Sequence, residues 1–326
     1  MYQMFFKKIT ILSILLVLIG NTVQYPQNVW EFPRETTTKN TIKTVFKTFS
    51  TKLTTTTTVT TPTTPTTTTT SPTNTKSYLQ TQWYSDFAMK DKTWNIVKNS
   101  YGYKNRNYLS FENDTVLSVF YPNGSYIPSI IENIGGTGFY ASPFNLQYAN
   151  QVTFEYDVYF EDDFDFVKGG KLPGLFGGEY GCSGGRDNDE CFSTRYMFRE
   201  NGFGELYLYL NNSNLVYNYC DMPNIICNPN FGDSIGRGSF KFEKNKWTKL
   251  SQTIKLNSIN NSDGEIIINV NDLQVIYLNN TVFRIYNNTN FMGVFFDTFF
   301  GGGDPSFATP KDQYIYYKNF NLKIDN

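Results

Sequence analysis

The feature that most constrains the fold is a strict alternation of apolar and polar residues, clearest from Val152 to Phe160. Successive side chains of a β-strand point to opposite faces, so this pattern predicts a half-buried strand. Helical periodicity is nearly absent, and the 24 Tyr and 29 Phe favour strands. We therefore expect an all-β fold, a jelly-roll sandwich of two antiparallel sheets. Turns rich in Asn, Gly and Asp separate further predicted strands, at 265–270, 273–278, 293–298 and 314–322.

A Thr-rich segment cannot take part in that fold. Thr dominates residues 36–75, with Pro62, Pro65 and Pro72 between the runs. Such a segment has too little apolar surface to offset the entropy lost on ordering. Thr with Pro is typical of an O-glycosylated stalk, and a linker without sugar is the alternative. We assign residues 23–76 to a disordered linker and residues 77–326 to one folded domain.

The N-terminus predicts secretion. Lys7 and Lys8 precede an apolar run from Ile9 to Ile19, and small or polar residues follow it. This is the pattern of a signal peptide, which we assign to residues 1–22. The run is short for a membrane span, although an uncleaved anchor is the alternative. We expect an extracellular protein with no membrane span after cleavage.

The cysteines and glycosylation motifs fit that compartment. Cys182 with Cys191 and Cys220 with Cys227 each bracket a short loop, so we predict these two disulfides, with free or cross-paired thiols as the alternative. Six Asn-x-Ser/Thr motifs are candidate N-glycan sites on surface turns, at Asn113, Asn123, Asn211, Asn260, Asn279 and Asn287.

Charge and composition narrow the chemistry. The formal net charge is -1, so no bulk attraction to nucleic acid or to an anionic membrane is expected. The chain has no His, which removes the commonest metal ligand and the commonest general base. We expect no cofactor and no metal, with acid–base chemistry left to Tyr, Lys, Asp, Glu or Cys.

The segments CFSTRYMFR, Cys191–Arg199, and GFGELYLYL, Gly202–Leu210, predict a β-hairpin. A three-residue loop at 201–203 pairs Arg199 with Glu205 and Arg195 with Tyr209. A two-residue Asn-Gly loop is the alternative, and it would divide the polar set between the two faces. In the three-residue register, one face of the hairpin carries Ser193, Arg195, Tyr207 and Tyr209, while the leucines between the tyrosines face the core.

This set of residue types suits removal of a proton next to a carboxylate, as at C5 of a uronic acid. An Arg fork matches the carboxylate and stabilises the charge that builds on it, and a phenol or amine with a lowered pKa can accept the proton. The simpler alternatives are a sugar-stacking platform or cross-strand packing for the tyrosines and a cross-strand ion pair for Arg199 with Glu205.

The chain resembles the alginate lyases of polysaccharide lyase family 14 and, less closely, the glucuronan lyases. The motifs that carry this resemblance occur in order along most of the domain. They are YPNGSYIPS, Tyr121–Ser129; GGTGFYASP, Gly135–Pro143; VTFEYDVYFEDDFDFVKGGKLPGL, Val152–Leu175; CFSTRYMFRENGFGELYLY, Cys191–Tyr209; and GVFFDTFFGGGDPSFATPKDQYIYYKNF, Gly293–Phe320.

The resemblance implies a β-jelly roll with a cleft on its concave sheet and a metal-independent lyase that acts by β-elimination. The functional residues of the family match Lys171 in the GGK motif, Ser193 and Arg195 in STR, and Tyr207 and Tyr209 in YLY. The expected partner is an acidic polysaccharide of alginate or glucuronan type, and we expect a monomer. The alternative is a carbohydrate-binding wall or matrix protein without turnover, which would have no use for a proton acceptor.

Overall fold

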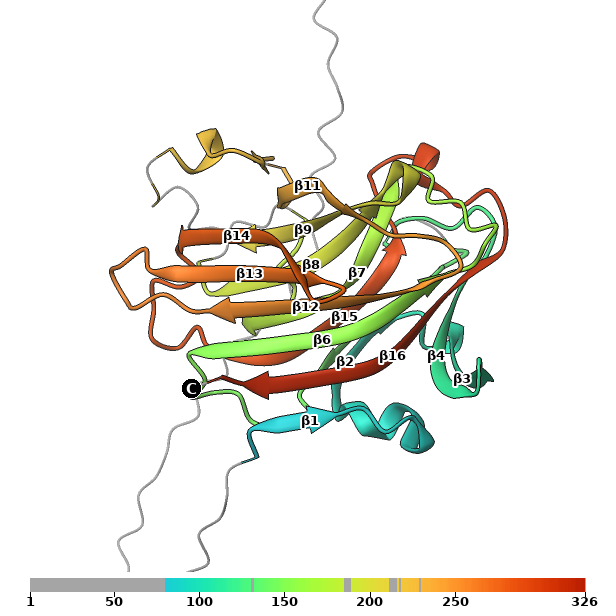
Figure 1. The fold of residues 1–326 in the computed structure, drawn as a ribbon, viewed down its shortest axis with the longest axis horizontal. Coiled ribbons are helices and arrows are strands. Elements are labelled where there is room, and N and C mark those ends of the chain that lie inside the picture. Colours follow the sequence, from blue (N-terminus) through green and yellow to red (C-terminus); the bar gives the residue numbers. More distant parts are fainter. Residues whose placement is uncertain are drawn as a thin grey trace, which may run out of the picture. The chain divides into compact units, whose positions relative to one another are not determined.

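The computed structural model describes residues 80–129, 132–184, 189–210, 216, 218–228 and 230–325. The predicted signal peptide, the predicted linker and Asn211 lie outside these residues. The described part is a sandwich of two antiparallel sheets, as predicted, with eight strands in each (Figure 1).

Sheet A contains most of the strands near the C-terminus of the chain. Its order is β14 (Leu273–Thr281), β13 (Gly264–Val270), β12 (Trp247–Lys255), β6 (Gln151–Phe160), β16 (Gln313–Ile324), β4 (Asp114–Tyr121) and β3 (Arg106–Phe111), and β1 (Gln82–Tyr84) also pairs with β16.

Sheet B supplies the floor of the candidate site. Its order is β10 (Ile225–Ile226), β11 (Asp233–Lys241), β9 (Phe203–Leu210), β8 (Cys191–Arg199), β7 (Gly169–Gly178), β15 (Phe291–Phe300), β5 (Thr137–Ala141) and β2 (Ile96–Tyr101).

The described helices are all short 3-10 segments, in agreement with an all-β chain. They are η1 (Phe87–Trp94), η2 (Tyr103–Asn105), η3 (Glu200–Gly202), η5 (Tyr219–Asp221) and η6 (Pro305–Phe307). Within the described ranges, no helix has the length and apolar character that crossing a membrane would require.

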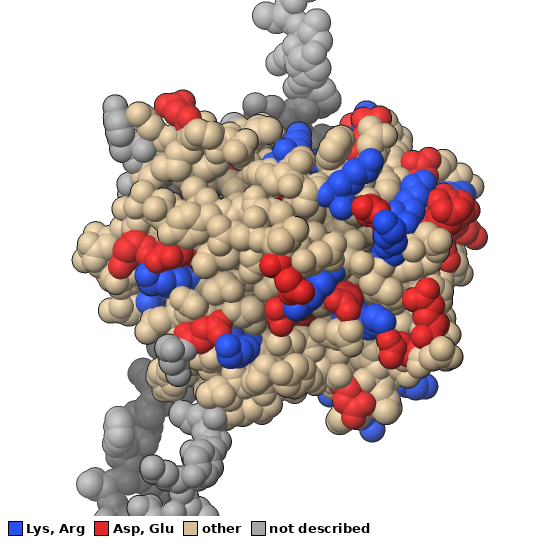
Figure 2. Space-filling view, in the orientation of Figure 1, with Lys and Arg blue, Asp and Glu red and all other residues tan. Residues whose placement is uncertain are grey.

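Alternation along β6 shows how the sequence forms the sandwich. Phe154, Tyr156 and Val158 are fully buried between the sheets. Glu155 lies on the opposite, outer face, where its carboxylate accepts a hydrogen bond from the side chain of Asn321. Figure 2 shows that acidic and basic side chains are interspersed on this outer face of sheet A. The outer face of sheet A is therefore a solvated surface of mixed charge.

Aromatic side chains fill the space between the sheets. Trp94 is fully buried, and its ring packs edge-on against Phe139, Phe296 and Phe320, with centroids 4.7 to 5.5 Å apart. Burial of a large apolar side chain stabilises a fold by about 1.5–3 kcal/mol, so this cluster is a principal contact between the two sheets. The core leaves the outer face of sheet B available for polar side chains.

Candidate active site

A groove of about 760 Å³ lies on the outer face of sheet B. Side chains of β7, β8, β9, β11 and β15 line it, and four of the five residues singled out in the sequence are among them: Lys171, Arg195, Tyr207 and Tyr209. Alternation accounts for their placement, because Leu206 and Leu208 point from the same strand into the core. The predicted division of β9 into a core side and a groove side is confirmed.

The register of the β8–β9 hairpin differs from the predicted one. Arg195 lies opposite Tyr207, and Ser193 opposite Tyr209. The three-residue loop is Glu200–Gly202, one position earlier than expected, because Asn201 and Gly202 both adopt left-handed backbone angles. Moving the loop by one residue shifts the pairing by two, so each side chain stays on its predicted face.

Lys171 is buried in the floor of the groove. Its Nζ atom lies 3.3 Å from the centroid of the Tyr207 ring and 3.0 Å from Sδ of Met197. Burial and the nearby charges of Arg195 and Arg199 hold the pKa of Lys171 well below its usual range. The ring face favours the charged amine, but removal from water is the larger effect at a fully buried site. Lys171 is thus suited to accept a proton.

The tyrosine pair lies beside this amine. The rings of Tyr207 and Tyr209 meet edge-on with centroids 5.5 Å apart, and both side chains are largely buried. Burial and the neighbouring Tyr209 raise the pKa of Tyr207 to about 12. A phenol with a raised pKa keeps its proton at neutral pH, so Tyr207 is a potential proton donor. This outcome differs from the expectation that each potential acid–base group has a lowered pKa.

Arg195 has a partner that sequence analysis missed. Its guanidinium forms an ion pair with Asp297 of β15, and both side chains are nearly inaccessible. Asp297 also accepts a hydrogen bond of 2.6 Å from the hydroxyl of Tyr101. Among the described residues, Nε and Nη2 of Arg195 have no hydrogen-bond partner although they are buried. Arg195 therefore lines the groove with part of its donor fork unused.

Ser193 does not line the groove, contrary to the expected placement. Its side chain is fully buried, and its hydroxyl donates a hydrogen bond of 2.9 Å to the backbone oxygen of Cys182. The Cys182–Cys191 disulfide, which the sequence predicts, holds this covering segment against the end of β8. Ser193 thus faces the predicted side of the sheet but lies beneath a loop.

The second predicted disulfide, Cys220–Cys227, is also present. It closes the loop that contains β10 and leads to one wall of the groove, where Ile226 and Phe231 are half exposed. Residues 301–304 and Phe307 line the groove as well. Both disulfides therefore support segments next to the groove.

The predicted ion pair between Arg199 and Glu205 is confirmed. Arg199 Nε donates to Glu205 Oε1 at 2.8 Å, on the diagonal of the hairpin rather than directly across it. The other carboxylate oxygen accepts hydrogen bonds from Ser234 at 2.6 Å and from Arg237 at 2.7 Å. With Nη2 of Arg199, which also donates to Oε1, four donor atoms satisfy this fully buried carboxylate, for which the sequence predicted only Arg199 as a partner.

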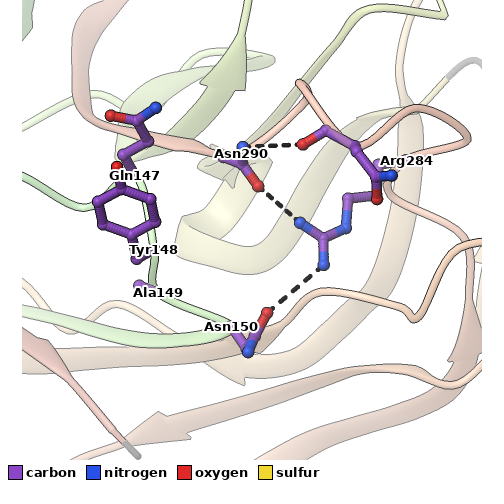
Figure 3. A pocket seen from close by; sticks show the side chains of 7 residues that line it. Gln147, Tyr148, Ala149, Asn150, Arg284 and Asn290 are labelled. Atoms are coloured by element: carbon purple, nitrogen blue, oxygen red, sulfur yellow. Dashed lines mark hydrogen bonds between the residues drawn. The ribbon is translucent and has the colours of Figure 1, made fainter.

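A separate pocket of about 390 Å³ contains Arg284 (Figure 3). Its Nη1 donates to Asn290 at 2.7 Å, its Nη2 lies 3.5 Å from Asn150, and its Nε donates to the backbone of Asn257 at 3.1 Å. With every nitrogen of the guanidinium in contact with a protein acceptor, Arg284 connects neighbouring loops. This pocket has the character of a structural junction.

Among the described residues, no group of three or more Cys, Asp and Glu side chains is arranged to hold a metal ion. The absence of a metal and a cofactor stays a prediction. The five described glycosylation motifs have exposed Asn side chains, and their modification also stays a prediction: Asn113, Asn123, Asn260, Asn279 and Asn287.

Comparison with known proteins adds a family match to this geometry. A model of the family described as Polysaccharide lyase 14 matches residues 110–320. A PL-14 alginate lyase from Aplysia kurodai is 34% identical; the match covers 76% of this chain and 100% of that one, with a TM-score of 0.68. Alginate lyase vAL-1 from Chlorella virus is 26% identical over 74% of this chain and 98% of its own, with a TM-score of 0.63. No curated protein matches the chain in sequence.

Proposed function

The chain belongs to polysaccharide lyase family 14, and from this premise we propose that it cleaves a uronic-acid polymer, of alginate or glucuronan type, by β-elimination. The observation that carries the proposal is the contact between Lys171 and Tyr207. Their surroundings shift the two pKa values in opposite senses, down for the amine and up to about 12 for the phenol. Two adjacent groups with separated pKa values form an acid–base pair.

In the proposed reaction, Lys171 removes the proton at C5 of a uronate as its neutral amine. The electron pair of that C–H bond forms the C4–C5 double bond, and the bond from C4 to the glycosidic oxygen breaks. The Tyr207 or Tyr209 hydroxyl donates a proton to the departing oxygen. The products are a chain with a new reducing end and a chain that begins with an unsaturated uronate.

Arg195 stabilises the negative charge that grows on the substrate carboxylate as the C5 proton leaves. Two of its nitrogens have no protein acceptor, although both are buried in this structure, and Asp297 fixes the orientation of the guanidinium. Ser193 acts indirectly, by holding the backbone at Cys182 above the end of β8. The proposal includes secretion, a jelly-roll topology and independence of metal ions, as the sequence predicts.

A panel of polyuronates tests this function. Purified protein should release products with the ultraviolet absorbance of a C4–C5 double bond from at least one polymer, with and without a chelator. Lys171→Ala should abolish the signal, and Tyr207→Phe or Tyr209→Phe, whichever removes the donor hydroxyl, should reduce it on the order of a hundredfold or more. Polymer binding without any unsaturated product would instead support the alternative of a carbohydrate-binding protein.

A further inference from the structure

Two arginines converge on one buried carboxylate at the edge of the groove. Arg199 at the end of β8 and Arg237 in β11 both contact Glu205, each through a different carboxylate oxygen. Ser234 supplies a further hydrogen bond to the same carboxylate. One arginine suffices to neutralise a carboxylate, so this cluster carries one positive charge in excess.

An irregularity in β11 places Arg237. Ile235 lies opposite Leu206 and Phe240 opposite Gly204, so four residues of β11 face the single residue Glu205. Gly236 and Gly238 flank Arg237, and both have positive φ angles, which glycine adopts without strain. Bulges of this kind bend a strand and redirect a side chain, and they are common next to active sites.

The donors of Arg237 are not used up by Glu205. Its side chain is 43% exposed, whereas that of Arg199 is 18% exposed. Within the described part of the chain, only Nε of Arg237 hydrogen-bonds to protein groups, so Nη1 and Nη2 are available to a ligand. A purely structural counter-charge for Glu205 would not need to line the groove, as Arg237 does.

The arginine pair lies close to the proposed acid–base pair. The guanidinium carbon of Arg199 is 5.6 Å from the centroid of the Tyr207 ring, and Nζ of Lys171 is 3.3 Å from the same centroid. A polymer held over Lys171 would extend past Tyr207 toward Arg199 and Arg237. In a polyuronate, the next sugar carries a carboxylate of its own.

We propose that Arg237, supported by Arg199, binds the carboxylate of the uronate next to the one that loses its C5 proton. This inference depends on the proposed function and adds a requirement to it: the preferred substrate has two consecutive uronates. The planar fork of Arg237 can hold Glu205 with Nε and the substrate carboxylate with its terminal nitrogens. Chains in which neutral sugars alternate with uronates would bind more weakly.

The experiment compares Arg237→Gln with the wild type on two substrates. One is a homopolymeric polyuronate that the wild type cleaves, and the other is the same polymer after partial reduction of its carboxyl groups to alcohols. Lys241→Gln is the matched control, because this substitution also removes one positive charge from β11. Lys241 is exposed and does not line the groove. Arg237→Lys keeps the charge and loses the planar fork.

On the polyuronate, Arg237→Gln should raise KM about tenfold with little change in kcat, since a contact made equally in the ground and transition states has been lost. The KM of Arg237→Lys should lie between those of the wild type and Arg237→Gln, and the KM of Lys241→Gln should equal that of the wild type. On the carboxyl-reduced polymer, the KM of the wild type should rise until it is close to that of Arg237→Gln. This convergence of the two enzymes would support a contact between Arg237 and a second carboxylate.

Two other results would overturn the inference. An unchanged KM for Arg237→Gln on the polyuronate would show that Arg237 does not contact the substrate. An equal rise in KM on both polymers would show that Arg237 has a structural role only. Both results require an active wild type, so they leave the proposed lyase function intact. A wild type that forms no unsaturated product from any polyuronate would overturn the function and this inference together.

Discussion

At the scale of single residues, Lys171 occupies a position that opposes folding and favours proton transfer. Its amine is buried beside Tyr207 and near two arginines, which lowers its pKa below the usual value of 10.5. Between the folded and the unfolded pKa, the unfolded chain binds more protons than the folded chain, so stability rises with pH in that range. The destabilisation caused by burying the amine of Lys171 reaches its full value once the pH falls below the pKa in the folded state.

Lys171→Met tests this cost directly. The variant should lose lyase activity and gain on the order of 1 kcal/mol or more in the free energy of unfolding at pH 7, because a similar volume is filled without a charge. The gain should shrink as the pH approaches 10.5. Urea denaturation at several pH values measures it, and the exposed Lys241→Met is the control. A gain that is independent of pH would contradict the explanation.

Asp297 stabilises the fold, because its carboxylate compensates the charge of the buried Arg195 guanidinium. Asp297→Asn removes the negative charge that faces Arg195 and leaves the guanidinium buried without compensation. We expect a loss of about 3–5 kcal/mol in the free energy of unfolding. Asp272→Asn is the matched control, because it breaks a pair with Lys249 in which the carboxylate is 78% exposed. That change should cost less than about 1 kcal/mol by denaturant titration; equal losses would refute the distinction.

At the scale of elements, local sequence patterns located the predicted strands well. The strand expected at 152–160 is β6, and those expected at 293–298 and 314–322 are the central parts of β15 and β16. A period of two is a local property, and so is the assignment of each residue to a face. For this reason the groove side of β8 and β9 was predictable although the hairpin loop was placed one residue too late.

Contacts between distant segments were not predictable in the same way. Asp297 is 102 residues from Arg195 in the sequence, and nothing in its strand distinguishes it from other exposed-looking carboxylates. The burial of Ser193 depends on a loop that folds over it, and the bulge around Arg237 depends on its pairing with β9. Each depends on tertiary structure, which a periodic pattern does not encode.

The β8–β9 loop gives a prediction at this scale. Gly202 has a φ of 79°, and an added Cβ would lie 2.6 Å from the backbone oxygen of Phe242. Gly202→Ala should therefore lower the free energy of unfolding by more than about 2 kcal/mol and reduce activity, since the hairpin carries both tyrosines. Gly124→Ala, with a φ of 81° and open space around it, isolates the backbone cost. Equal effects of the two changes would contradict the steric argument.

At the scale of the whole described unit, charge is divided between the two sheets. The outer face of sheet A mixes both signs, as in the pair formed by Lys255 and Glu265. Three arginines and two acidic side chains line the groove on sheet B together with Lys171, which acts as a neutral amine in the proposed reaction, and the chain as a whole has a formal net charge of -1. The lining of the groove thus holds one more cationic than acidic side chain, in a protein that is nearly neutral.

Salt should weaken the capture of an anionic polymer by this groove. We expect KM for a polyuronate to rise several-fold between about 0.05 and 0.5 M salt, while kcat changes much less, because ions screen exposed charges over a Debye length of roughly 4–13 Å in that range. Initial rates at several salt concentrations measure the effect. Lys249→Gln, which removes a charge from the outer face of sheet A, should leave the salt dependence unchanged. A flat KM would contradict electrostatic capture.

The alternation of groove and core residues along β9 has a consequence for how such a protein can diversify. Removing one residue from the middle of the strand would shift the register of the residues that follow by one. Tyrosines would then point into the core and leucines toward the substrate. Replacements at every second position, by contrast, can vary the groove without disturbing the interior. New specificities are therefore expected to arise by substitution at alternate positions of the strands. They are also expected to arise in the loops around the groove, where changes in length do not alter the strand register.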